Sequence, residues 1–163
     1  MLQKFRLSCL LMLAPLWLLA QVKLAENGRA FAEIVLPAES PWLLKYAAEE
    51  LQTHLQKLSG AEFPLVEKSS GKLAIYLGEA AARSAGISLN GLPEDSFLIS
   101  VTAQAVHIAG RDNPSGSNPG FFHLFYDEKE RGTLFGVYQF LEKFGIIWVA
   151  PHYTHIPQQA TMQ

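Results

Sequence analysis

The sequence predicts an α/β domain with a mixed β-sheet of about five strands, flanked by two main helices. Five runs of apolar and β-branched residues, each bounded by Gly, Pro or polar residues, have the pattern of strands. Two longer stretches have apolar residues at helical spacing. The chain has 163 residues, of which 49% are hydrophobic, so it can build one ordinary core but not two full domains.

The five strands are expected at 31–36, 62–67, 73–77, 96–101 and 105–109. Pro64 places its run at an edge of the sheet, because proline cannot donate a hydrogen bond to a neighbouring strand. Only three residues separate the last two strands, which predicts an antiparallel hairpin. A further apolar run follows at 146–150, and 151–157 is expected to close the domain as a rigid tail.

The first main helix is expected to begin with Ser40 as N-cap and Pro41 in the first turn, and to stop at Gly60. The second runs from about Thr133 to Gly145, and a short helix is expected at 80–85. Gly136 lies inside the second helix, where glycine costs about 1 kcal/mol relative to alanine. We therefore expect this helix to approach the sheet closely at Gly136.

The N-terminus has the pattern of a signal peptide. Lys4 and Arg6 precede the apolar run Leu7–Ala20, which predicts export to the periplasm or the extracellular space with cleavage after Ala20. A permanent membrane anchor is the less fitting alternative, because the run is short and Pro15 interrupts it. The expected organisation is a signal peptide at 1–20, a linker at 21–30, one domain at 31–157 and a tail at 158–163.

Charge and cysteine content narrow the possible partners. The formal net charge is −2 and no run of Lys or Arg occurs, which argues against nucleic acid as a partner. The single cysteine, Cys9, lies in the predicted signal peptide. The mature domain would then have no thiol for a disulfide or a metal.

No metal or cofactor site is expected. His152 and His155 are close in sequence, but no third ligand accompanies them and HExxH is absent, so a small metalloenzyme built on this pair is a weak alternative. His107 alternates with Val106 and Ile108, and we expect it to point away from the buried face. The glycines Gly110, Gly116 and Gly120 lack the order of a phosphate-binding loop.

No catalytic residue is expected either. Glycoside hydrolysis needs two carboxyl groups on either side of a sugar ring, and the sequence spacing pairs none of the candidates. They lie in predicted turns or on a helix: Glu94, Asp95, Asp112, Asp127, Glu128, Glu130 and Glu142. Glu49 and Glu50 are assigned to the polar face of the first helix. No GxSxG motif is present.

Aromatic residues are concentrated in the last third of the chain, at Phe121, Phe122, Phe125, Tyr126, Trp148 and Tyr153. Aromatic rings stack on sugars, but they also fill cores and domain interfaces, and the sequence leaves both open.

Several segments in order resemble one family. AAEELQTHLQKLSGAEFPLV, LAIYLGE, DSFLISV, VHIAGRD, RGTLFGVYQFLEKFGIIWVAP and HIP are similar to the N-terminal domain of alpha-glucuronidases and related glycoside hydrolases, and to the domain that precedes the barrel in bacterial beta-N-acetylhexosaminidases. The resemblance covers about Phe31 to Pro157. The segment 112–126 departs from it as an insertion.

The resemblance implies a zincin-like accessory domain without the metal motif, packed against a catalytic (β/α)8 barrel that carries the acids. No catalytic residue can then be assigned here, and the expected function is that of a non-catalytic accessory domain of an exported glycoside hydrolase. The alternative is a free-standing exported carbohydrate-binding or interaction module that uses the aromatic loop.

Overall fold

The computed structural model describes residues 22–112, 130–150 and 152–163. The predicted signal peptide and nearly all of the 112–126 insertion, with Phe121, Phe122, Phe125 and Tyr126, lie outside the described residues. Within these ranges, no helix is both long and apolar enough to cross a membrane.

A five-stranded mixed sheet forms the centre of the fold, in the order β4-β3-β5-β7-β6. Its strands are β3 (Ala32–Val35), β4 (Leu65–Val66), β5 (Leu73–Leu77), β6 (Phe97–Val101) and β7 (Ala105–Gly110). The first four in this order are parallel, and β6 runs antiparallel to β7. The mixed sheet is confirmed, with β4 at one edge and β6–β7 as the hairpin.

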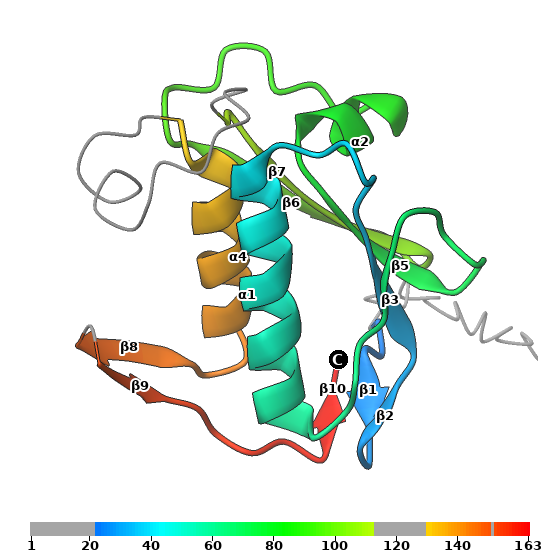
Figure 1. Ribbon diagram of the computed structural model, residues 1–163, viewed down its shortest axis with the longest axis vertical. Coiled ribbons are helices and arrows are strands. Elements are labelled where there is room, and N and C mark those ends of the chain that lie inside the picture. The colour runs from blue at the N-terminus through cyan, green and yellow to red at the C-terminus, as the bar shows by residue number, and fades with distance from the viewer. Residues whose placement is uncertain (1–21, 113–129, 151) are drawn as a thin grey trace, which may run out of the picture.

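Two long helices cover one face of the sheet, with α1 and α4 side by side in front of it (Figure 1). The described helices are α1 (Trp42–Ser59), α2 (Glu79–Ser84) and α4 (Gly132–Glu142). The prediction that Ser40 caps α1 is wrong, because Pro41 occupies the cap position and no side chain bonds there. Gly60 does end α1 as expected, in the left-handed conformation at φ 70°.

The main core fills the space between the sheet and these two helices. Ile34, Ile75 and Ile108 come from three neighbouring strands and are all fully buried. Leu51 and Leu55 of α1 pack into the same cluster. Because side chains alternate along a strand, the residues between these isoleucines face the other side of the sheet.

α4 lies so close to β7 that glycine is required on both sides. A Cβ on Gly110 would overlap the backbone of Gly132, and a Cβ on Gly132 would overlap the backbone near Gly110. Thr133 joins the two elements, because its hydroxyl accepts a hydrogen bond from the Gly110 N–H at 2.9 Å. One turn further on, a Cβ at Gly136 would lie 2.8 Å from Ile108 Cγ2, which fits the predicted close approach.

Two small sheets lie outside the central one. β1 (Ala25–Glu26), β2 (Arg29–Ala30) and β10 (Thr161–Met162) form a three-stranded sheet, and β8 (Ile147–Ala150) pairs antiparallel with β9 (Tyr153–His155). The segments expected as linker and tail therefore each contribute strands, held together by long-range pairing. The segment 151–157, expected to close the domain as a rigid tail, contains the strand β9.

Gly136→Leu tests the contact of α4 with the sheet. We expect the variant to lose about 1–3 kcal/mol of unfolding free energy, because leucine would overpack against Ile108 and Phe97. The matched control is Glu142→Leu at the exposed end of the same helix, which should change stability by less than about 0.5 kcal/mol. Urea melts measure both, and a midpoint for Gly136→Leu equal to or above wild type would contradict the packing described.

Candidate functional site

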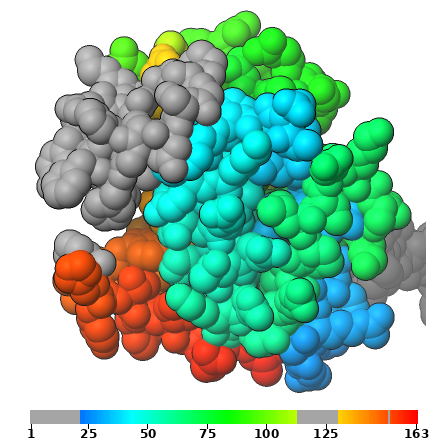
Figure 2. Space-filling model, viewed as in Figure 1, coloured from blue at the N-terminus to red at the C-terminus, as the bar shows by residue number. Residues whose placement is uncertain are grey.

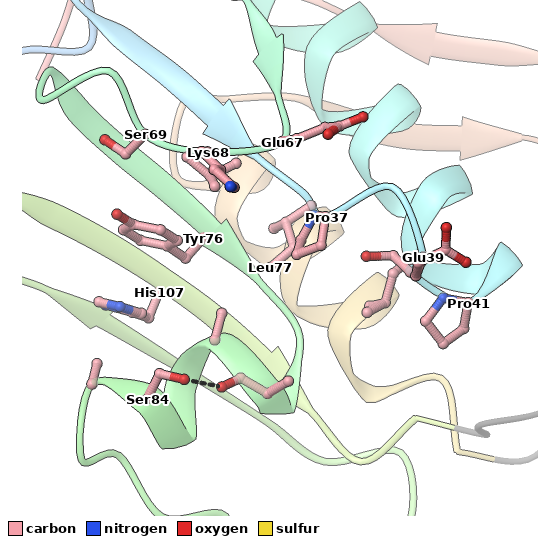
Figure 3. A pocket seen from close by; sticks show the side chains of 16 residues that line it. Pro37, Glu39, Pro41, Glu67, Lys68, Ser69, Tyr76, Leu77, Ser84 and His107 are labelled. Carbon is pink, nitrogen blue, oxygen red and sulfur yellow. Dashed lines mark hydrogen bonds between the residues drawn. The ribbon is translucent and has the colours of Figure 1, made fainter.

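A crevice of about 710 Å³ lies on the face of the sheet opposite α1 and α4. Its floor consists of Val35, Tyr76 and His107, one from each of three neighbouring parallel strands. Segment 67–69 borders it on one side and α2 on the other, with the chain that leads into α1 at its end (Figure 3). We take this crevice, defined by these residues, as the candidate site.

Side chains alternate between the two faces of the sheet along each strand, and this places the residues of the floor on one face. Tyr76 is paired in register with His107, so both rings rise from the same face of the sheet. The rings are stacked with centroids 5.0 Å apart and an angle of 14° between their planes. Figure 3 shows the Tyr76 and His107 side chains beside one another.

The wall at 67–71 is tied down by a buried carboxylate. Glu33 on β3 is 1% exposed, and its oxygens accept hydrogen bonds from the Ser69 hydroxyl, the Ser70 N–H and the Ser70 hydroxyl at 2.6–2.9 Å. Burial alone raises the pKa of Glu33, but these hydrogen bonds outweigh it and leave the pKa below its ordinary value. Sequence reasoning missed Glu33, because a single glutamate in an apolar strand gives no signal of its partners.

His107 points away from the main core, as the alternation predicted, and it is 8% exposed. Its Nδ1 is buried and has no hydrogen-bond partner among the described residues. Burial lowers the pKa of His107 below its ordinary value, which favours the neutral imidazole.

His152 and His155 lie apart from this crevice. His152 follows the undescribed residue 151 in a turn, and His155 lies exposed on β9. Within the described ranges, no group of three or more His, Cys, Asp or Glu residues could hold a metal ion.

Three of the carboxylates considered for catalysis have structural partners around the start of α4. Asp95 accepts a hydrogen bond from the Arg131 N–H at 2.7 Å, and Glu130 pairs with Arg111 at 2.8 Å. Asp112 accepts hydrogen bonds from both the N–H and the hydroxyl of Thr133. Asp127 and Glu128 lie outside the described residues.

Asp112 has an unusual acidity. Burial raises its pKa to about 6, although the two hydrogen bonds from Thr133 act in the opposite direction. A carboxyl group with such a pKa could act as a general acid. Here, however, both of its oxygens are engaged in holding the start of α4 to the end of β7.

Glu50, assigned to the polar face of α1, lies partly buried between the two long helices. The Tyr138 hydroxyl of α4 donates a hydrogen bond to its Oε2 at 3.2 Å. Burial and the Glu50 carboxylate raise the pKa of Tyr138. The sequence could not show this contact, because the partner comes from α4, 88 residues away along the chain.

The β8–β9 hairpin presents an apolar surface. Trp148 points inward and makes edge-to-face contacts with His54 and Tyr138, at centroid distances of 5.0 and 4.9 Å. On the outside, Ile147, Val149 and Tyr153 are 57%, 58% and 61% exposed. The hairpin forms the edge of the molecule beside the helical layer (Figure 2).

The comparisons with known proteins add one finding. No family model matches the sequence, and no curated protein matches it. Among solved structures, the fold is similar to a family GH115 4-O-methyl-alpha-glucuronidase, BtGH115A, described as having specificity for decorated arabinogalactans. The match has a TM-score of 0.60 at 16% identity and covers 88% of this chain.

This chain has the fold of one part of a glycoside hydrolase. It spans 17% of the length of that enzyme, and at this identity the match concerns the fold alone. The similarity agrees with the alpha-glucuronidase-type resemblance at the level of the fold.

The buried Asp112 predicts a pH dependence of stability. Its pKa is about 6 in the folded state against an ordinary value of 3.8, so the folded protein binds more protons than the unfolded chain between these two pH values. The contribution of Asp112 to stability therefore increases as pH falls through 6 and is smallest above it. Relative to Asp112→Asn, the wild type should gain about 1–3 kcal/mol of unfolding free energy between pH 7.5 and pH 4.5.

Urea melts of both proteins at each pH measure this difference. His107 titrates in both proteins, so its effect cancels. A difference between wild type and variant that stays constant with pH would show that Asp112 is ionised throughout.

Proposed function

We propose that this chain is a non-catalytic N-terminal accessory domain of an exported glycoside hydrolase, and that it packs against a catalytic (β/α)8 barrel outside these residues. The observation that carries the proposal is the fold similarity, which covers 88% of this chain but only 17% of the hydrolase. A (β/α)8 barrel takes about 250 residues, more than the 163 of this sequence. The barrel would supply the catalytic acids.

The contacts of the carboxylates support a non-catalytic role. Hydrolysis of a glycoside needs one carboxyl group free to give a proton and a second free to act as base or nucleophile. Asp95, Asp112 and Glu130 are engaged instead with Arg131, Thr133 and Arg111. Together these pairs hold the start of α4.

The hairpin supports packing against another domain. Ile147, Val149 and Tyr153 are exposed together on one short hairpin, and Trp148 fixes that hairpin to the helices. Exposed apolar residues that cluster on a fixed element are typical of domain interfaces. Export follows from the signal-peptide pattern at 1–20. The zincin-like topology and the relation to beta-N-acetylhexosaminidases belong to the same proposal.

We expect the purified chain to hydrolyse neither aryl alpha-glucuronides nor aryl N-acetylhexosaminides, because the candidate carboxyl groups of Asp95, Asp112 and Glu130 are engaged in structural contacts. Release of the chromogenic phenol measures this directly. Asp112 is the strongest rival candidate because of its raised pKa. Turnover that survives purification and is lost in Asp112→Asn, but not in the exposed control Glu142→Gln, would overturn the proposal.

A further inference from the structure

The crevice lies where two neighbouring parallel strands send the chain to opposite faces of the sheet. After β3 the chain enters α1, whose side chains pack in the main core with Ile75 and Ile108. After β5 it enters α2, whose Ala82 packs with Ala109 and Leu89 in a second cluster on the other face. In open α/β sheets, ligands bind outside the carboxyl ends of the strands at such a switch point.

Small side chains leave the crevice open. The wall formed by α2 presents Ala80, Ala81 and Ser84, and Val35 and Leu77 supply apolar surface beneath. Sites for small molecules generally measure roughly 300–1,000 Å³ and combine an apolar lining with a few polar groups. The crevice, at about 710 Å³, meets both conditions.

His107 is a polar group in the floor whose ring stacks on Tyr76. It is more than nine-tenths buried, and its Nδ1 meets no partner in the described part of the chain. A buried N–H without an acceptor is rarer and more costly than a buried lone pair, so the neutral ring carries its proton on Nε2. His107 then offers one hydrogen-bond donor and no charge.

The rim of the crevice carries charged side chains of both signs. Lys68 stands on one side with Glu67, and Glu39 lies at the end of the crevice near α1 (Figure 3). One cation and two anions give no attraction for a phosphate or another polyanion. They do give donors and acceptors together, which suits hydroxyl groups, since each hydroxyl both donates and accepts.

We propose that the crevice above Tyr76 and His107 binds a small neutral polyhydroxylated ring, such as a mono- or disaccharide. The apolar C–H face of the ring lies on Val35 and the Tyr76–His107 pair, and its hydroxyls bond to His107 Nε2 and to the charged rim. The inference concerns a face of the sheet that has no part in the proposed function. It does not depend on that function.

The test is a titration of the ¹⁵N-labelled full chain with the methyl glycosides of glucose, galactose, xylose and mannose. At least one should give saturable shifts of amide signals in β5, β7 and α2, with a Kd of order 1 mM. Ala80→Trp would fill the crevice from an exposed position and should weaken binding at least about tenfold. The matched control, Ala103→Trp, lies in the exposed β6–β7 turn and should bind as wild type does.

Three results would overturn the inference. One is the absence of saturable shifts with all four glycosides, and another is unchanged binding in Ala80→Trp. The third is tighter binding of inorganic phosphate than of any glycoside, which would show that the crevice selects anions. Because Ala80 is exposed, loss of binding in Ala80→Trp with an unchanged melting temperature cannot be a failure to fold.

Discussion

The close approach of α4 to the end of β7 is the constraint on which the rest of the structure depends. Gly110 and Gly132 let the two backbones touch, and Thr133 bonds to Gly110 and to Asp112 across the contact. This contact fixes the position of α4 on the sheet, and α1 packs beside it. The β8–β9 hairpin follows directly from α4 and is held through Trp148. The exposed apolar surface of the hairpin is therefore placed, through α4, by this contact.

Coverage of the sheet is unequal on its two faces, and this gives the domain two different surfaces. On the side of the two long helices, the β8–β9 hairpin carries exposed apolar residues, which suit a neighbouring protein domain. On the other face the short α2 leaves part of the sheet uncovered, which suits a small molecule. The first surface agrees with the fold similarity to part of a glycoside hydrolase, and the second is a separate property of this chain.

The sequence predicted most of the fold and little of the site, for physical reasons. The central strands and the helices have apolar patterns long enough to be recognised, and Gly136 was read correctly because a glycine inside a helix needs a reason. Strands of two or three residues, such as β1 and β9, are set by distant pairing partners and have no local pattern. The crevice depends on the strand order β3-β5-β7, which no local pattern reveals. The alternation around His107 gave its direction but not its burial.

Amide hydrogen exchange of the full chain tests the central constraint most directly. The Gly110 N–H bonds to the Thr133 hydroxyl at the contact between β7 and α4. If this contact holds the fold together, Gly110 should exchange only by global unfolding, with an exchange free energy equal to that from urea melts. The amides of the β8–β9 hairpin should exchange at a lower free energy, by local opening. Exchange of Gly110 as fast as that of the hairpin would show that α4 separates from the sheet without unfolding, and would contradict the account.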